Sequence, residues 1–336
     1  MRTKQLGRTG LRVSEICLGT MTFGNQADEA TSFQIMDAAD RAGVYFFDTA
    51  DGYPLGGEPE TRGRTEEIVG RWLKDRGARH RIVLATKCFA AMSDLPNDRG
   101  LSRKHIIEAC DASLRRLGTD YIDLYQAHFP DELTPIEESL RAFDSLVHAG
   151  KVRYIGCSNY PAWRLTEALW TSDKHGLARY DCVQPRYNLL FRHIEDELLP
   201  LCRAHGVGVI AYNPLGGGML TGRYRQEREA RAGTRFGLNY VGEMYRKRYW
   251  NDAVFEAVEK LGDFVEGRGK SLTHAALAWV LAQEGVTSAI LGASRPEQLE
   301  ESLGGVGLQL DEEEMRACDD VWYSLPRERD PSIARR

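Results

Sequence analysis

Two side chains that could exchange a proton, Asp48 and Tyr53, follow one short apolar segment of the chain. Residues 44–47 are apolar and mostly aromatic, which predicts a buried strand that ends at Asp48. A carboxyl group at that point, with a phenol soon after it on a glycine-containing loop, is unusual for packing alone. Catalytic chemistry is one interpretation, and a buried tyrosine whose hydroxyl has a structural partner is the other. The pair alone does not decide between them.

Polar residues also follow most of the other short apolar segments of the chain. These segments lie near residues 16, 45, 82, 121, 152, 182, 207 and 288. The polar residues at their ends are Thr20, Asp48, Lys87, His128, Ser158, Asn159, Gln184 and Tyr212. A single lysine or histidine after a strand is more often solvated or structural than catalytic. Their recurrence at the same end of successive strands favours one shared site.

Helical segments separate these apolar segments. Periodic apolar spacing predicts helices at residues 29–42, 65–76, 102–117, 135–148, 161–170, 194–205, 251–266, 272–283, from about 295, and 311–323. Strict alternation of strand and helix indicates a parallel sheet, and eight such units indicate an α/β fold of the (β/α)8 TIM-barrel type. An open doubly wound sheet would need a GxGxxG turn, and residues 19–24 do not fit one.

The segments outside the alternation complete the expected architecture. Residues 3–13 predict an N-terminal β-hairpin, residues 311–323 a C-terminal helical cover, and residues 213–250 a long irregular stretch. No linker is recognisable, so we expect residues 1–336 to form a single barrel domain.

In such a barrel the polar residues would meet at one mouth, where they could reduce a carbonyl group. That reaction needs a hydride donor and an acid that protonates the new alkoxide. A free tyrosine has a pKa of about 10, and an ammonium group beside it favours the phenolate and lowers that pKa. Lys87 could supply the ammonium, Asp48 could hold it, and His128 could polarise the carbonyl through a hydrogen bond.

Other residues at these strand ends suit a nicotinamide cofactor. Ser158, Asn159 and Gln184 carry donors and acceptors that match a carboxamide, and Tyr212 could stack against a flat ring.

Two further segments could bind phosphate. Residues 214–222 form a glycine-rich loop whose N–H groups could approach a pyrophosphate. Residues 292–295 open a helix after the eighth segment, where this fold favours phosphate. Ser294 and Arg295 there would suit a ribose 2′-phosphate, which indicates NADPH.

The chain resembles the aldo-keto reductase superfamily over essentially its whole length. The resemblance rests on GTMTFG at 19–24, DTADGY at 48–53, ATK at 85–87, DLYQAH at 123–128, IGCSN at 155–159 and ILGAS at 290–294. Residues 294–302 look most like the branch of bacterial sugar-type reductases and potassium-channel β subunits. The resemblance implies a catalytic tetrad of Asp48, Tyr53, Lys87 and His128, with Tyr53 as the proton donor.

The resemblance also implies a set of residues that bind NADPH or NADP+. These are Gly19, Thr20, Met21, Asp48, Ser158, Asn159, Gln184, Tyr212, Asn213, Pro214, Leu215, Gly216, Gly218, Gly222, Arg223, Gly292, Ser294, Arg295, Gln298, Glu301 and Ser302. The chain departs from the common pattern at Asn213 and Ser302, where serine and asparagine respectively are usual.

Apolar residues near the mouth and two loops could shape the substrate site. The expected pocket residues are Met21, Phe23, Tyr53, Phe89, His128, Phe129 and Tyr160. Residues 54–63 either border this pocket or form a solvated, turn-rich loop. The arginine-rich residues 221–250 could be a lid over the cofactor phosphates, a site for an anionic substrate such as a nucleotide-linked sugar, or a charged solvated loop. The lid is favoured because this stretch directly follows the glycine loop.

The composition excludes several classes of function. A net charge of −5 and a pI near 6.0 do not suggest a nucleic-acid-binding protein. The seven cysteines form no CxxC pair, which indicates reduced thiols and a cytoplasmic protein. We expect no signal peptide, no membrane span and no metal site, since no apolar stretch or histidine motif predicts them.

These observations predict an NADPH-dependent enzyme that reversibly reduces an aldehyde or ketone to an alcohol. A sugar-derived ketone and a xenobiotic carbonyl are both candidate substrates. The alternative is a regulatory protein that senses NADPH at the same site with little turnover. A metal-dependent sugar isomerase on the same barrel would need a cluster of carboxylate and histidine ligands at the strand ends.

Overall fold

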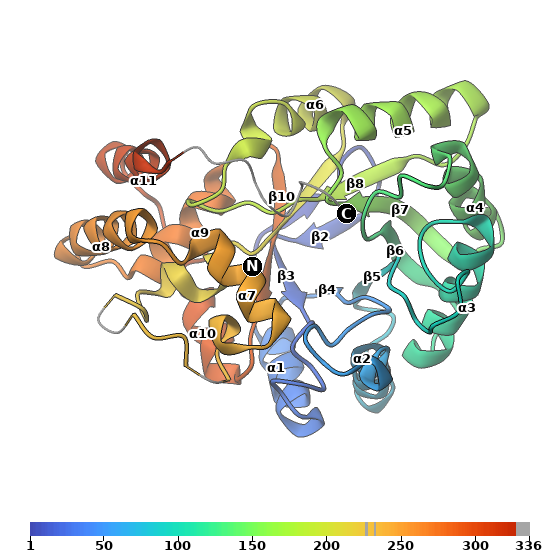
Figure 1. Cartoon of the computed structure of the whole chain (residues 1–336), viewed down its shortest axis with the longest axis horizontal. Helices are drawn as coiled ribbons and strands as arrows, with labels where there is room; N and C mark the ends of the chain where they lie inside the picture. The colour runs from blue at the N-terminus through green and yellow to red at the C-terminus, as the bar shows by residue number, and fades with distance from the viewer. Residues whose placement is uncertain (226–227, 232, 327–336) are drawn as a thin grey trace.

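The computed structural model describes residues 1–225, 228–231 and 233–326, and its centre is a closed barrel of eight parallel strands (Figure 1). The strands are β3 (Ile16–Gly19), β4 (Phe46–Asp48), β5 (Val83–Cys88), β6 (Ile122–Ala127), β7 (Val152–Ser158), β8 (Tyr180–Gln184), β9 (Gly208–Tyr212) and β10 (Val286–Gly292). Strands that follow one another in the sequence are neighbours, and β10 closes the barrel on β3. The predicted (β/α)8 barrel and the positions of its eight strands are therefore confirmed.

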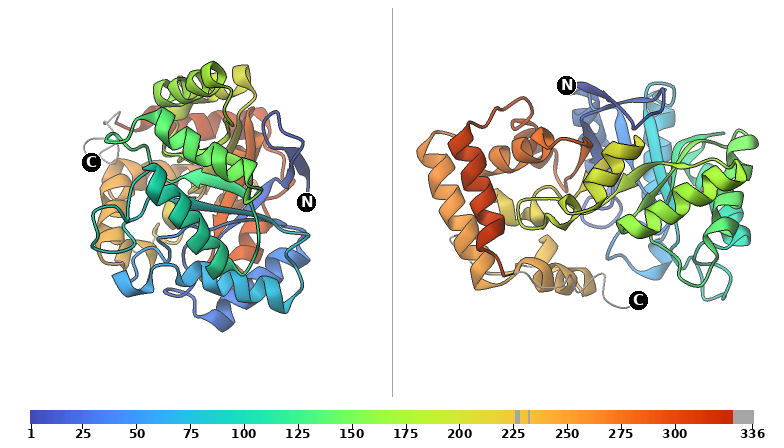
Figure 2. Two further views of the ribbon diagram at one scale, coloured as in Figure 1. Left: turned by 90° about the vertical axis from the view of Figure 1, so that its right-hand side faces the viewer. Right: turned by 90° about the horizontal axis from the view of Figure 1, so that it is seen from above.

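Helices surround this barrel as a ring (Figures 1 and 2). The ring contains α1 (Glu29–Arg41), α2 (Arg64–Asp75), α3 (Arg103–Leu117), α4 (Ile136–His148), α5 (Ala162–His175), α6 (Leu198–His205), α9 (Leu272–Ala282) and α10 (Pro296–Leu303). Two more helices, α8 (Asp252–Gly267) and α11 (Glu312–Ser324), pack on each other and on α9 outside the ring. The expected C-terminal helical cover is confirmed.

Helix α3 illustrates how the local sequence sets the bounds of these helices. The Ser102 hydroxyl accepts a hydrogen bond from the His105 N–H at 3.2 Å and caps the first turn. Gly118 ends the helix in the left-handed conformation, at a φ of 62°, which glycine adopts without steric cost. Between them Ile106, Cys110 and Leu117 form the face that is buried against the core.

An N-terminal hairpin closes one end of the barrel. Strands β1 (Thr3–Gln5) and β2 (Arg12–Ser14) pair in antiparallel fashion, as predicted. Leu6 and Val13 are fully buried and join the cluster of apolar side chains inside the barrel. They lie at the amino-terminal ends of the strands, so the opposite end remains as the mouth.

The barrel interior changes from apolar to polar along the strands. Inward-facing side chains at mid-strand are apolar: Cys17, Phe46, Ala85, Leu124, Cys182, Ile210 and Ile290. Because side chains alternate along a strand, the next inward positions on several strands lie two residues later. Those positions hold Asp48, Lys87, Gln126, Gln184 and Tyr212. The geometry of the sheet thus brings this polar layer together at the mouth.

The structure differs from the predicted helices in three places. Helix α5 continues to His175 before Gly176 ends it, rather than stopping near residue 170. The helix expected at 194–205 is a short 3-10 helix, η2 (His193–Glu195), followed by α6. The stretch predicted as irregular contains the 3-10 helices η3 (Gly216–Thr221) and η4 (Arg235–Gly237) and the helix α7 (Tyr240–Tyr249). No helix in the described part of the chain has the length and apolar character needed to cross a membrane.

Candidate active site

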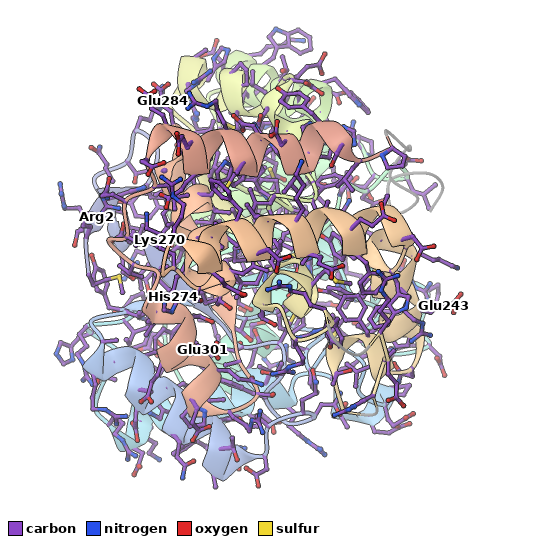
Figure 3. All side chains as sticks on the ribbon, turned by 90° about the vertical axis from the view of Figure 1, so that its left-hand side faces the viewer. Arg2, Glu243, Lys270, His274, Glu284 and Glu301 are labelled. Atoms are coloured by element: carbon purple, nitrogen blue, oxygen red, sulfur yellow. The ribbon has the colours of Figure 1, made fainter. Side chains whose placement is uncertain are left out.

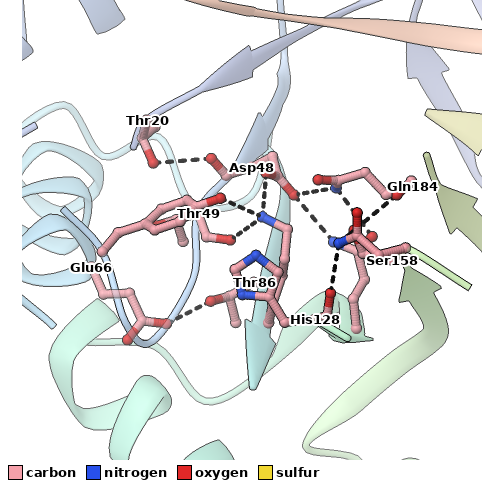
Figure 4. Close-up of polar contacts among 12 residues, drawn as sticks. Thr20, Asp48, Thr49, Glu66, Thr86, His128, Ser158 and Gln184 are labelled. Atoms are coloured by element: carbon pink, nitrogen blue, oxygen red, sulfur yellow. Dashed lines mark hydrogen bonds and ion pairs between the residues drawn. The ribbon is translucent and has the colours of Figure 1, made fainter. Parts of the chain in front are cut away.

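Asp48, labelled among its polar contacts in Figure 4, forms a buried ion pair with Lys87 at the mouth. The Lys87 Nζ donates to the Asp48 Oδ2 at 2.5 Å and to the Thr49 carbonyl at 2.8 Å. Lys87 is fully buried, and a buried ammonium needs such partners to remain charged. Burial alone would lower the pKa of Lys87, but Asp48 and Tyr53 outweigh it and raise that pKa. Lys87 is therefore a cation at neutral pH.

Tyr53 lies within hydrogen-bond distance of this cation. The Lys87 Nζ donates to the Tyr53 hydroxyl at 3.4 Å and lies 4.9 Å from the centre of the tyrosine ring. Burial raises the pKa of Tyr53, the Lys87 ammonium lowers it, and the Asp48 carboxylate raises it further. The sequence led us to expect a lowered pKa. That expectation was wrong for the net shift of the Tyr53 pKa, because the effect of burial outweighs that of the ammonium. The phenol is therefore protonated at neutral pH.

The second carboxylate oxygen of Asp48 accepts two amide hydrogen bonds. Gln126 donates to the Asp48 Oδ1 at 3.1 Å, and Gln184 donates to the same atom at 2.9 Å. The sequence analysis did not select Gln126. Its position two residues after the inward-facing Leu124 would have identified it, because alternation places both side chains inside the barrel. These bonds fix the orientation of the carboxylate that holds Lys87.

His128 faces Tyr53 across the mouth. The two ring centres are 5.7 Å apart, and the rings are nearly perpendicular. The histidine ring stacks on Phe129 at 5.0 Å, and the Asn159 side chain donates to the His128 carbonyl at 2.9 Å. The structure therefore brings all four predicted tetrad residues to one place, with His128 fixed by contacts to both its ring and its backbone.

A chain of hydrogen bonds links the residues expected to contact a nicotinamide. The Ser158 hydroxyl donates to the Gln184 carbonyl at 2.8 Å, and the Asn159 Nδ2 donates to the Ser158 oxygen at 3.0 Å. The Tyr212 hydroxyl donates to the Asn159 Oδ1 at 2.9 Å. Burial raises the pKa of Tyr212 to about 12, although Arg248 and Arg186 act against the rise. Tyr212 is thus a neutral aromatic surface beside a row of amide and hydroxyl groups.

The loop after β9, predicted from the sequence to approach a pyrophosphate, is rich in left-handed glycines. Gly216, Gly217, Gly218 and Gly222 all have positive φ angles, between 59° and 100°. Glycine adopts this left-handed conformation without steric cost, and it leaves the backbone of the loop without side chains. Asn213 at the start of this loop also has a positive φ, and its side chain donates to the Tyr249 hydroxyl at 2.9 Å.

Several of the residues expected to bind the adenosine part of NADPH lie at or near the start of α10. The Ser294 hydroxyl and N–H both donate to the Gln298 Oε1, at 3.1 and 2.9 Å. Arg295 is exposed beside them, before the first turn of the helix. Glu301 lies a turn further on, where its carbonyl contacts the His274 ring at 2.7 Å (Figure 3). Ser302 is buried, and its hydroxyl donates to the Gln298 carbonyl at 2.8 Å.

Glycines stand at the mouth ends of both β3 and β10. Gly19 and Gly292 are partners across the two strands, at the mouth end of both. A Cβ on Gly19 would lie 2.6 Å from the Ile290 side chain, so only glycine fits there. The adjoining Thr20 hydroxyl donates to the Asp48 carbonyl at 2.9 Å. The absence of side chains at both strand ends suits the close approach of a flat ligand.

The expected pocket residues divide into two groups. Met21, Phe89 and Phe129 are partly exposed near the mouth, as are Tyr53 and His128. By contrast, Phe23 is fully buried in the core and Tyr160 is 2% exposed. These two aromatic rings pack inside the molecule rather than lining an open pocket.

The loop at residues 54–63 lies against the start of α7. The Leu55 N–H donates to the Met21 carbonyl at 3.0 Å, and the Asn239 side chain donates to the Gly56 carbonyl at 3.1 Å. The sequence analysis favoured residues 221–250 as a lid over the cofactor phosphates but predicted no helix there. The buried α7 positions Val241, Tyr245 and Tyr249 recur every four residues, which is the spacing that could have revealed an inward-facing helix.

The described residues contain no group of three or more histidine, cysteine, aspartate or glutamate side chains that could hold a metal ion. The polar groups described at the mouth include a carboxylate, an ammonium, a phenol, an imidazole and several amides.

Comparison with known proteins identifies the family of this chain. The Aldo/keto reductase family model matches residues 15–323. The chain is 41% identical over 328 residues to Uncharacterized oxidoreductase YrpG of Bacillus subtilis (strain 168), with 96% of each chain covered. It is 38% identical over 309 residues to Probable voltage-gated potassium channel subunit beta of Arabidopsis thaliana, with 91% of each covered. It is 36% identical over 352 residues to Protein tas of Escherichia coli (strain K12), which covers 97% of this chain and 99% of that protein. The chain belongs to the aldo/keto reductase family.

Proposed function

We propose that this protein is an NADPH-dependent enzyme that reversibly reduces an aldehyde or a ketone to an alcohol. Members of its family are oxidoreductases that act on carbonyl compounds, typically with NADPH. The observation that carries the proposal is the contact of Tyr53 with the buried pair of Lys87 and Asp48 at the barrel mouth.

The residues around the mouth fit a nicotinamide dinucleotide phosphate. Ser158, Asn159 and Gln184 would hold the carboxamide, and Tyr212 would stack on the ring. The left-handed glycines after β9 would receive the pyrophosphate, and Arg295 would pair with the 2′-phosphate. When bound, this cofactor supplies the hydride.

The protein's own side chains provide the proton and stabilise the developing charge. Tyr53 donates its hydroxyl proton to the carbonyl oxygen, and its raised pKa keeps that proton in place until the reaction needs it. The Lys87 ammonium stabilises the phenolate that remains, while Asp48 fixes the position of the ammonium. An N–H of the His128 ring, which faces Tyr53, polarises the carbonyl.

The Tyr53→Phe variant tests this assignment because it removes only the acidic hydroxyl. We expect kcat for aldehyde reduction to fall about 10²- to 10⁴-fold, with the Kd for NADPH within a few-fold of wild type. Tyr160→Phe is the matched control, since the Tyr160 ring is buried in the core and packs on Tyr180. Near wild-type kcat in Tyr53→Phe would show that another group is the acid.

A regulatory protein that senses NADPH is the second candidate. Its support is the similarity to proteins named as potassium channel β subunits, whereas the intact tetrad favours an enzyme. Both candidates bind the cofactor, so binding does not distinguish them. The two candidates are distinguished by stopped-flow absorbance at the NADPH band, recorded after mixing with a reactive aldehyde. A single-turnover loss of absorbance supports the enzyme, and a constant signal supports the sensor.

A further inference from the structure

The loop that carries Tyr53 stays attached to β5 after β4 has ended. Strands β4 and β5 are neighbours in the barrel (Figure 1). Beyond β4, the Thr49 N–H donates to the Ala85 carbonyl at 2.9 Å, and the Asp51 N–H donates to the Lys87 carbonyl at 3.1 Å. The loop of the proposed proton donor is therefore bonded to the same strand that carries the Lys87 ammonium.

The side chain of Asp51 continues this pairing. Its Oδ2 accepts a hydrogen bond from the Phe89 N–H at 3.4 Å, a bond that the Asp51 backbone carbonyl would accept if the parallel pairing went on. The carboxyl group thus takes the place of the carbonyl, and the backbone can turn away. The Tyr53 N–H donates to the Ala50 carbonyl at 3.2 Å and closes that turn.

The burial of Asp51 needs an explanation that the proposed chemistry does not supply. Asp51 is fully buried, and its Oδ1 has no hydrogen-bond partner among the described residues. A buried carboxyl group with one unbonded oxygen costs free energy. Its bond to Phe89 joins the loop of Tyr53 to a residue expected in the substrate pocket, so this cost has a return in the geometry of the mouth.

A steric contact at the next residue brings the same two loops together. A Cβ on Gly52 would lie 2.6 Å from the Ala90 Cβ. The φ of Gly52 is not positive, so its backbone conformation does not require glycine. The close approach of the two loops does.

The separation of these loops sets the geometry of the proton donor. The Tyr53 hydroxyl lies 3.4 Å from the Lys87 Nζ, at the long end of hydrogen-bond distances. Tyr53 belongs to one loop and Lys87 to the neighbouring strand, so a shift of the loop away from β5 would break this contact. A misplacement of about 1 Å can lower the rate of a reaction about 100-fold.

We propose that Asp51 is a positioning residue, which holds the loop of Tyr53 against β5 so that the Tyr53 hydroxyl remains in reach of the Lys87 ammonium and the substrate. This inference rests on the proposed reductase function. Asp51 acts through its bond to the Phe89 N–H, and Tyr53 remains the acid.

Replacement of Asp51 tests whether an acceptor at this position is needed. Asn keeps an oxygen that can accept from the Phe89 N–H, and Ala has none. In Asp51→Ala we expect kcat for benzaldehyde reduction to fall about 10- to 100-fold, with the Kd for NADPH within a few-fold of wild type. Asp51→Asn should keep kcat within a few-fold of wild type.

The matched control is Glu314→Ala on α11. Glu314 is also a buried carboxylate, and it accepts from the Lys270 Nζ at 2.6 Å. Its removal should lower the stability but leave kcat unchanged, which separates a loss of position from a loss of stability.

The contact between the loops can be tested separately with a double-variant cycle. Gly52→Ala should lower kcat, because its Cβ would push the loop away from Ala90. Ala90→Gly removes the atom that this Cβ would meet, so the double variant Gly52→Ala/Ala90→Gly should recover most of the loss. A double variant no better than Gly52→Ala would contradict the proposed contact.

Two kinetic results would overturn the role of Asp51. An unchanged kcat in Asp51→Ala would show that the loop keeps its place without the carboxyl group. A kcat as low in Asp51→Asn as in Asp51→Ala would show that the acceptor bond to Phe89 is not what matters.

Hydrogen exchange separates this inference from the reductase proposal. If the wild type reduces no aldehyde, the proposed function fails, but the attachment of the loop can still be measured by mass spectrometry of peptides that cover residues 49–53 and 88–90. Faster exchange in Asp51→Ala than in Asp51→Asn would support the positioning role. Equal exchange in the wild type and both variants would refute it.

Discussion

Lys87 shows how the surroundings of one side chain set its charge. The ATK motif predicted a lysine at the mouth, and the structure adds its partners: the Asp48 carboxylate at 2.5 Å, the Thr49 carbonyl and the Tyr53 hydroxyl. Burial alone would favour the neutral amine, yet the pKa of Lys87 is raised. A residue whose pKa is raised in the folded state stabilises the fold up to that pKa, so this stabilisation persists through the neutral range.

Removing the ammonium should therefore affect both stability and activity. We expect Lys87→Met to lower the free energy of unfolding by about 3–5 kcal/mol, because it leaves the Asp48 carboxylate buried without a counter-ion. The double variant Asp48→Asn/Lys87→Met should recover much of this loss, since it buries no charge, but should stay inactive. Urea unfolding and steady-state kinetics measure the two effects. Recovered activity in the double variant would contradict the role proposed for Lys87.

The buried carboxyl group of Asp51, near Tyr53 on the same loop, should make the free energy of unfolding depend on pH. Burial raises its pKa to about 7, the Glu66 carboxylate adds to the rise, and its Oδ1 has no hydrogen-bond partner among the described residues. Because the folded pKa is above the unfolded value, its contribution to stability is present below about pH 4 and is lost as the pH rises through about 7.

The variant Asp51→Asn should not show this loss. From pH 4 to pH 8 we expect the unfolding free energy of the wild type to fall, relative to the variant, by a few kcal/mol, at about 1.4 kcal/mol per unit of pKa shift. Exposed Asp94→Asn is the control for the change of charge. Parallel pH profiles of wild type and Asp51→Asn, measured by denaturant unfolding, would show that Asp51 has an ordinary pKa.

At the scale of single elements, the sequence predicted strands and ring helices better than the segment that crosses the mouth. Polar residues lie at or near the ends of most of the eight strands, and helices such as α3 carry clear caps, so both were recognisable. Helix α7 was missed because its surface is dense in arginine and its apolar stripe is narrow. Gln126 was missed because it lies before the end of its strand, although its position two residues after Leu124 places it inside the barrel.

Gly217 offers a test of how α7 is attached. It has a φ of 70°, and a Cβ there would lie 2.5 Å from the Tyr245 ring. Gly217→Ala should therefore add a steric clash to a backbone cost of about 1–2 kcal/mol and should increase amide hydrogen exchange in residues 240–249. Gly233→Ala is matched in conformation, with a φ of 78°, but its Cβ would meet nothing within 4 Å. Equal exchange in the two variants would mean that Gly217 does not position α7.

At the scale of the whole molecule, the strict alternation of strands and helices was enough to predict the barrel, because closure follows from eight parallel units. The family match over residues 15–323 and the packing of both the hairpin and α11 on barrel elements lead us to propose one domain for residues 1–336. The distribution of charge over the mouth was not predictable. Which arginines face inward depends on how α7 lies across loops that are distant in the sequence.

Cofactor binding should stabilise the whole barrel, because the proposed contacts come from strands on opposite sides of the mouth. At about 100 times its Kd, NADPH should add about 2.7 kcal/mol to the free energy of unfolding and raise the Tm by roughly 4 °C. We expect NADH at the same concentration to give a smaller rise, since it lacks the 2′-phosphate that exposed Arg295 would pair with.

The Arg295→Gln variant separates this contact from the rest of the site. In this variant we expect NADPH and NADH to raise the Tm by nearly equal amounts. The Tm without cofactor should be unchanged, because Arg295 is exposed before the first turn of α10. Arg141→Gln on α4 is the control, since Arg141 pairs only with Glu137 on the surface among the described residues. Equal shifts with the two cofactors in the wild type would contradict the preference for NADPH. A difference retained in Arg295→Gln would assign the 2′-phosphate to other groups, with Ser294 the nearest candidate because its hydroxyl lies at the same helix start.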